Sequence, residues 1–283
     1  MELQVVTMTP DWAHELIEKH NVNNRKVRRD VVQAYVHAIK SGQYKLTHQG
    51  VAIGTNGVLL DGQHRLLAIV ESGIQVPIVM ATECDPSIYD VLDTGCTRKS
   101  VDVLGAYGAQ DAGGSSSTVR TYIMYHEHHD KIWQGRLRYP NNTEILEFYQ
   151  TRSEQVDYAS RKGKAVWSAF KQVKSHSAVG TFILLALDRG YPRSHIEFFT
   201  EKLATGSNLE DTCPILRFRA GAINGIIEQV RHNQRQATLA SLIKTFNDWN
   251  NGVERRLFRI PPMPPMPVVA PYNEERHGIT GIV

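Results

Sequence analysis

A run of five residues at 61–65, Asp-Gly-Gln-His-Arg, has side chains of the kinds that could bind a phosphate group. A short apolar run before it predicts a buried strand, and the apolar run after it predicts a helix that ends near Gly73. Main-chain N–H groups are unpaired where such a helix begins, and the helix dipole favours an anion there. Gly62 would let the backbone approach an anion closely, and His64 and Arg65 could bind it. This segment, called the 61–65 corner below, is therefore a candidate phosphate site, and a solvated polar turn is the alternative.

The sequence Asp-Gly-Gln-His-Arg-Leu-x-Ala resembles the signature box of the ParB/sulfiredoxin superfamily. That superfamily includes partition CTPases, sulfiredoxin, free-serine kinases and many phage proteins, and its box holds nucleotide phosphates at a strand–helix corner. Three further stretches fit its phage and bacterial branch: Asn24-Arg25 ahead of a helix, 50–60 as a hairpin-like lead-in, and the Leu-Asp-Thr-Gly-x-x-Arg run that begins at Leu92. The resemblance covers roughly residues 20–108 and implies a domain like the N-terminal domain of ParB.

The resemblance also implies roles for individual residues. Asp61, His64 and Arg65 would act on the phosphates, with Asp61 as a ligand of Mg²⁺. The nucleotide, ATP or CTP, would be contacted by Asn24, Arg25, Gly62, Gln63, Asp93, Thr94 and Arg98. Gln63 stands where sulfiredoxin has its reactive cysteine, so peroxiredoxin repair is excluded. Partition CTPases have Glu-Arg-Arg in this box, and Asp61 would replace the missing acid.

Each of these segments also fits a purely structural role. Arg28 and Arg29 fall in the first turn of a predicted helix, where cations oppose the helix dipole unless an anion is bound nearby. A solvated basic turn would account for them equally. The segment from Asp93 to Arg98 could complete the phosphate site, or it could be a turn whose side chains cap the following helix.

Composition limits the broad class. The 283 residues are 41% hydrophobic and 22% charged, which is typical of a globular protein, and no apolar run approaches the ~18 residues of a membrane span. The first residues lack the pattern of a secretory signal. Three well-separated cysteines match neither a zinc site nor a disulfide framework, so we expect a cytoplasmic protein with no membrane partner. The net charge of +3 is weak support for nucleic acid.

Periodicity predicts a mixed α/β (α+β) chain. A helix is expected after Thr9-Pro10 and another over 28–41. Two strands, 45–53 and 58–60, are expected to form a hairpin around Asn56-Gly57. Val76 to Met80 is expected to be a strand that Pro77 places at an edge or at its start. The predicted domains are a ParB/sulfiredoxin-like sheet domain at 1–110, an all-helical domain at 111–260 and a weakly ordered Pro-rich tail at 261–283. The Gly-Gly-Ser-Ser-Ser run at 113–117 is interpreted as a flexible or helix-capping junction.

Helices are expected over most of the second domain, among them 143–161, 164–173 and 215–232. Two features there carry weaker signals. His126 and His129 share a helix face and could ligate a metal with His176, but a solvated helix end explains them better. A basic face for a nucleic-acid backbone, or else a set of scattered surface cations, is formed by Arg217, Arg219, Arg231, Arg235 and Lys244.

Together these features predict a nucleotide-dependent phosphohydrolase, phosphotransferase or switch of ParB-like type that acts with DNA. The superfamily implies a phage or mobile-element protein in the host cytoplasm. A DNA-binding module of the same fold without turnover is the first alternative. A ParB-like nuclease is the second, although no cluster of carboxylates supports it. Whether the chain forms a homodimer is left open.

Overall fold

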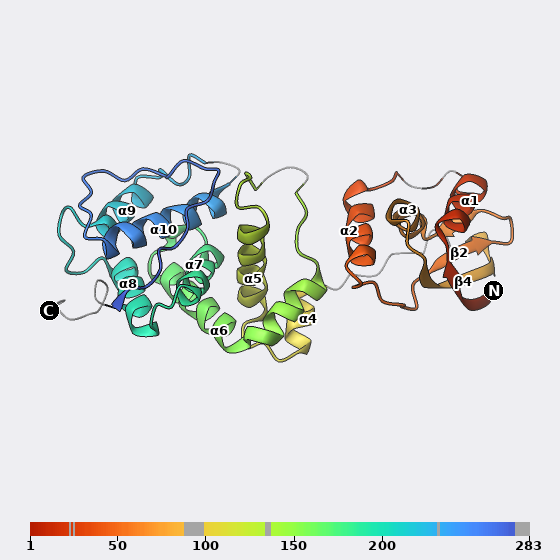
Figure 1. The fold of residues 1–283 in the computed structure, drawn as a ribbon, viewed down its shortest axis with the longest axis horizontal. Coiled ribbons are helices and arrows are strands. Elements are labelled where there is room, and N and C mark those ends of the chain that lie inside the picture. Colours follow the sequence, from red (N-terminus) through yellow and green to blue (C-terminus); the bar gives the residue numbers. More distant parts are fainter. Residues whose placement is uncertain (23, 25, 88–98, 134–136, 231–232, 275–283) are drawn as a thin grey trace. The chain divides into compact units, whose positions relative to one another are not determined.

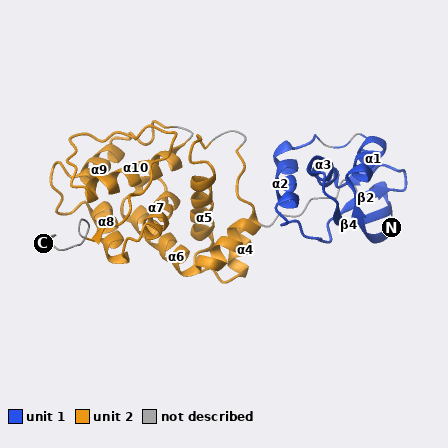
Figure 2. Ribbon diagram, viewed as in Figure 1, with its two compact units in different colours: residues 1–97 blue, residues 98–283 orange. Residues whose placement is uncertain are grey.

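The structure is a computed structural model that describes residues 1–22, 24, 26–87, 99–133, 137–230 and 233–274. The chain folds into two compact units, residues 1–97 and residues 98–283 (Figure 2). Over the described residues, the first unit holds a sheet and the helices α1 to α3, and the second is helical (Figure 1). The expected mixed α/β class with a helical majority is confirmed.

The first unit is built on a mixed four-stranded sheet in the order β1-β4-β2-β3. Its strands are β1 (Glu2–Met8), β2 (Val51–Gly54), β3 (Leu59–Asp61) and β4 (Val76–Cys84). Its helices are α1 (Pro10–His20), α2 (Arg29–Lys40) and α3 (Gln63–Ser72). β1 and β4 are antiparallel, as are β2 and β3, whereas β2 and β4 run parallel.

One face of this sheet forms the core of the unit. Val76, Ile78 and Met80 alternate along β4 and are buried under the helices, and α3 packs between α1 and α2 (Figure 1). On the edge strand, Leu3 and Val5 are 64% and 61% exposed. This arrangement is usual for a sheet that is covered on one side only.

Local sequence signals place several ends of these elements correctly. Thr9 Oγ1 accepts a hydrogen bond from Trp12 N at the start of α1, and Gly73 ends α3 with a φ of +70°. β2 and β3 form the expected hairpin. Pro77 is the second residue of β4, so the expectation of a strand start is confirmed.

Two predictions for the strands of this unit are wrong. The expected strand from Lys45 to Ile53 begins only at Val51, because Gly50 O accepts a hydrogen bond from the Arg65 side chain rather than from a strand. No strand was predicted for β1. Its apolar residues occur on both faces, so they show no clean alternation.

The second unit packs around one apolar helix. It contains α4 (Ser100–Ala106), α5 (Ala112–Glu127), α6 (Asn142–Ala169), a 3₁₀ turn η2 (Lys171–Val173), α7 (His176–Asp188), α8 (Arg193–Thr205), α9 (Pro214–Ile223) and α10 (Gln234–Asn250). α7 is buried along most of its length against α5, α6 and α10 (Figure 1). A helix that is apolar all round is stable only in such a position.

The Gly-Gly-Ser-Ser-Ser run is not a flexible junction but lies in the first turns of α5. Asp111 caps the helix by accepting a hydrogen bond from Gly114 N, and Ser115 and Ser116 are buried. A Cβ on Gly114 would lie 2.2 Å from Ser160 Oγ of α6. The small residues are therefore needed for close packing between the two helices.

Other boundaries also differ from the predictions. Ser100 Oγ and Ser116 Oγ are 2.7 Å apart, so α4 packs on α5, and the units divide at residue 97 rather than after residue 110. Two predicted helices, 143–161 and 164–173, form the single helix α6, which has a non-helical residue at Arg152. The helix predicted from residue 215 to residue 232 ends at Ile223.

The Pro-rich segment is extended as expected, but over 261–274 it packs on the helical unit. Met266 and Val269 are 1% exposed, and Pro267 O accepts a hydrogen bond from Tyr125 Oη at 2.9 Å. Tyr272 N donates to Arg189 O at 3.0 Å. The expectation of a weakly ordered tail is wrong for these residues, because their apolar side chains have a core to join. No described helix is long and apolar enough to span a bilayer.

Candidate functional site

The 61–65 corner lies where β3 passes into α3, as the sequence predicts. Gly62 turns the chain there with a φ of +102°, a conformation that favours glycine. A Cβ on this residue would lie 2.9 Å from Val51 Cγ2 and 3.0 Å from Gly50 O, so the space also requires glycine. Gly62 is the N-cap of α3 and offers no side-chain acceptor to the first turn, which has no acidic residue either. This is the kind of helix start that can receive an external anion.

Asp61 lies at the entrance to this turn. Its Oδ1 accepts a hydrogen bond from Gly62 N at 2.6 Å, and its Oδ2 lies 3.7 Å from Arg65 Nη1. The Asp61 side chain is 24% exposed, so one carboxylate oxygen supports the turn while the other can reach solvent.

Arg65 is held by groups of the protein itself. Nη1 donates to Gly50 O at 3.0 Å, and Nη2 donates to the side chain of Gln49 at 3.1 Å. The guanidinium also lies over the ring of Tyr35, and the Arg65 side chain is only 12% exposed. Arg65 thus connects the residues just before β2 to α3. In this arrangement its guanidinium contacts other groups of the protein rather than solvent.

His64 also has a structural partner. Its Nε2 accepts a hydrogen bond from Arg28 N at 3.0 Å, and the residue is 7% exposed. A ring nitrogen that accepts a hydrogen bond carries no proton, so the imidazole is neutral in this arrangement. A neutral ring adds no positive charge to the corner.

The segment from Asn24 to Arg28 is brought against the corner. Asn24 Nδ2 donates to Leu59 O at 2.9 Å on β3, and Arg28 N bonds to His64 as described above. The Asn24 segment and the 61–65 corner, which the resemblance assigns to one site, are therefore neighbours. Arg25 lies outside the described residues, between these two anchored positions.

The cations next in sequence have partners at the surface. Arg28 Nη2 lies 2.7 Å from Asp30 Oδ2 with both side chains exposed, and Arg29 pairs with Glu71 on α3. For Arg29 this agrees with the solvated-turn alternative. Gln63 is 3% exposed, so a contact from it to a nucleotide would come from its main chain.

Three predicted contacts to the nucleotide, from Asp93, Thr94 and Arg98, lie outside the described residues. The structure adds two groups that the sequence analysis missed, Gln49 and Tyr35, which hold the Arg65 guanidinium. The positions of these two residues in the sequence do not indicate that they contact Arg65. Their role is seen only in the folded structure. Burial raises the pKa of the nearby Tyr44 hydroxyl.

No three His, Cys, Asp or Glu residues within the described ranges are grouped so that they could hold a metal ion. A Mg²⁺ at Asp61 would therefore take most of its ligands from phosphate oxygens and water, which this ion accepts readily. In the helical unit, the rings of His126 and His129 pack edge-on against Tyr125.

No protein-family model, curated protein or solved structure matches the chain. The fold and the geometry of the corner therefore carry the functional argument.

Proposed function

We propose that the first unit binds the phosphates of a nucleotide, ATP or CTP, at the 61–65 corner. In this proposal the chain is a nucleotide-dependent phosphohydrolase, phosphotransferase or switch of ParB-like type that acts with DNA. Asp61 would hold Mg²⁺ against the phosphates, and the first turn of α3 would donate main-chain hydrogen bonds to them. His64 and Arg65 would keep this turn in place.

The observation that supports the proposal best is the meeting of two segments far apart in sequence. Hydrogen bonds from Asn24 and from Arg28 N bring the Asn24 segment beside β3 and the corner. The α3 N-cap there is a glycine. Such a junction combines main-chain donors, a carboxylate and a basic segment, which are the groups that Mg²⁺-bound phosphates require.

A groove of about 470 Å³ in the helical unit supports the DNA part of the proposal. Its cations outnumber its carboxylates: Arg217, Lys244, Arg255, Arg256 and Arg259 against Asp248 and Glu254. Asp248 pairs with Lys244 and Arg255. Arg256 and Arg259 make no ion pair within the described residues, so they could neutralise backbone phosphates. This groove shares Arg217 and Lys244 with the basic face predicted from sequence, whereas Arg219 donates to Leu203 O and Ala204 O. Arg235 lines a different cavity, and Arg231 lies outside the described residues.

The nucleotide part is tested by calorimetric titration of ATP and CTP with and without Mg²⁺, using the Asp61→Asn variant. Asparagine keeps the acceptor for Gly62 N–H and removes the charge, so the fold should persist. We expect wild-type binding to tighten with Mg²⁺, and the variant to lose that gain, about tenfold or more in affinity. Asp30→Asn is the matched control, because Asp30 is exposed and pairs with Arg28 at the start of α2. Equal binding by wild type and Asp61→Asn would refute the role of Asp61.

A DNA-binding module without turnover is the second candidate. It is favoured by the structural partners of Arg65 and His64, which leave neither side chain as a charged group turned toward a ligand. Both candidates predict DNA binding that weakens with salt. Changing Arg256 and Arg259 to Gln should lower the slope of log affinity against log salt concentration by about 1 for each arginine. A slope that the double variant leaves unchanged would remove this groove from the DNA site. If a nucleotide binds the chain and changes its affinity for DNA, the first candidate is supported over the second.

A further inference from the structure

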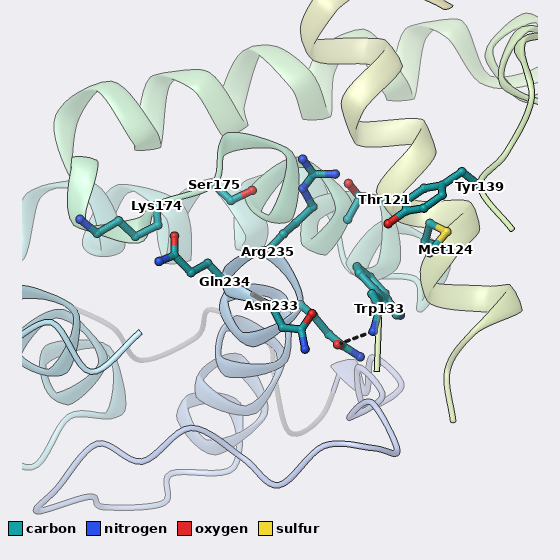
Figure 3. A pocket seen from close by; sticks show the side chains of 10 residues that line it. Thr121, Met124, Trp133, Tyr139, Lys174, Ser175, Asn233, Gln234 and Arg235 are labelled. Atoms are coloured by element: carbon teal, nitrogen blue, oxygen red, sulfur yellow. Dashed lines mark hydrogen bonds between the residues drawn. The ribbon is translucent and has the colours of Figure 1, made fainter. Parts of the chain in front are cut away.

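A second cavity in the helical unit lies far along the chain from the 61–65 corner. It has a volume of about 420 Å³ and opens between α5 and the first turns of α7 and α10 (Figure 3). Figure 3 shows Arg235 of α10 reaching up between Ser175 and Thr121. Cavities of this size are typical of sites for small organic ligands.

The cavity has positive charge that the protein does not balance. Arg235 makes no ion pair within the described residues, and no Asp or Glu lines the cavity. Arg120 of α5 lies near enough to repel it, and Arg120 Nε is buried with no hydrogen-bond partner. Desolvation, and then repulsion by Arg120, lower the pKa of Arg235. The Arg235 residue is exposed, so an anion that enters the cavity would meet a positive charge that no carboxylate of the cavity lining already neutralises.

The helix ends add to this positive potential. Arg235 is the second residue of α10, where a cation opposes the helix dipole, and the N-cap Asn233 makes no side-chain capping bond. Ser175 begins α7 on the same cavity and accepts a hydrogen bond from Ala178 N. Neither helix has an acidic residue in its first turn. A bound anion would interact favourably with both helix ends as well as with Arg235.

The opposite wall is apolar and aromatic. Met124, Trp133 and Tyr139 stand together there, across from Ser175 (Figure 3). Gln236, 1% exposed, fixes this wall by accepting from Trp133 N at 3.1 Å and donating to Lys131 O at 2.8 Å. Trp133 Nε1 donates to His128 O at 3.2 Å, which sets the plane of the indole. The wall is thus preformed, and a flat ring could pack against it.

We propose that this cavity binds a nucleotide unit, with its phosphate on Arg235 and the two helix ends and its base against the aromatic wall. The nucleotide unit is either a free mononucleotide or part of a single nucleic-acid strand. The site is separate from the nucleotide site proposed at the 61–65 corner and does not depend on it.

The test is calorimetric titration of the full chain with inorganic phosphate, AMP and single-stranded p(dT)₁₀. The diagnostic variant is Arg235→Gln, which keeps the length of the side chain and removes its charge. Arg193→Gln is the matched control, because Arg193 is exposed in the first turn of α8 and pairs with Glu154. Asp61→Asn separates this site from the corner.

We expect AMP or p(dT)₁₀ to bind the wild type, Arg235→Gln to weaken that binding about tenfold or more, and Arg193→Gln and Asp61→Asn to leave it unchanged. The ligand-free Arg235→Gln protein should unfold at about the same temperature as the wild type, since Arg235 is an exposed residue that makes no ion pair within the described residues. Tighter binding of AMP than of p(dT)₁₀ assigns a free nucleotide, and the reverse assigns a strand.

Four results would overturn the proposal. They are no binding of any probe, a loss of binding in Asp61→Asn but not in Arg235→Gln, inorganic phosphate that binds as tightly as AMP, and a lower unfolding temperature for Arg235→Gln. The last result would show that Arg235 stabilises the folded protein, which is a structural role and not a ligand-binding one.

Discussion

At the scale of single residues, two side chains of the 61–65 corner have structural tasks, and the chemistry that we propose falls on a third. Arg65 joins Gly50 and Gln49 to α3, and His64 holds Arg28 N. Asp61 carries a charge and is 24% exposed. One of its oxygens accepts the hydrogen bond from Gly62 N in the turn, and the other does not take part in the turn. Catalytic or binding chemistry at the corner therefore rests first on Asp61 and on main-chain donors.

Arg65→Ala should lower the free energy of unfolding by about 1–3 kcal/mol. The change leaves Gly50 O and the Asp61 carboxylate without their partner in a partly buried place. Urea denaturation monitored by circular dichroism measures the loss.

Arg29→Ala provides the comparison, because the Arg29 side chain is 70% exposed where it pairs with Glu71. This change should cost about 0–1 kcal/mol. If the two variants lost the same stability, the structural role given to Arg65 would be wrong.

At the scale of elements, the sequence predicts what local rules decide. Thr9 caps α1, Gly73 ends α3, and Gly62 makes the turn, because each acts within a few residues of itself. The incorrect predictions concern segments whose structure depends on residues far away in the sequence. The Gly-Gly-Ser-Ser-Ser run is packed helix because Ser160 of α6 meets it, and the Pro-rich segment is ordered because Tyr125 and Asn247 bond its main chain. Likewise, no local pattern shows that Gln49 binds Arg65 or that Arg28 N binds His64.

The first turn of α7 should make stability depend on pH. Burial, and then the nearby Lys164, lower the pKa of His176 below its ordinary value of 6.5. As the pH falls below about 6.5, the unfolded chain takes up a proton at this histidine before the folded one does. The stability contributed by neutral His176 is thus present above that pH and is lost as the pH falls.

His176→Gln should flatten this dependence between about pH 7.5 and about pH 5.5, as measured by urea denaturation across that range. His14→Gln is the control, because the His14 side chain is 57% exposed. A variant with the same pH profile as the wild type would show that His176 does not titrate differently in the folded state.

At the scale of the whole molecule, we have proposed places for phosphate in each unit. The first has the 61–65 corner, and the second has the basic groove at Arg256 and Arg259 and the cavity at Arg235. A chain that binds both a nucleotide and a nucleic acid could use them together. The division into a sheet unit and a helical unit follows from the change of hydrophobic period along the sequence. The exact residue where they divide does not, because it depends on the packing of α4.

The central claim is that nucleotide phosphates bind at the first turn of α3. The most direct measurement is a set of amide ¹H–¹⁵N spectra of the full chain, recorded as CTP or ATP is added with Mg²⁺. Binding at the corner should produce its largest shifts at the amides of Gly62 to Leu66, with smaller shifts in the Asn24 segment. No shifts at these amides, or shifts confined to the helical unit around Arg235, would contradict the claim.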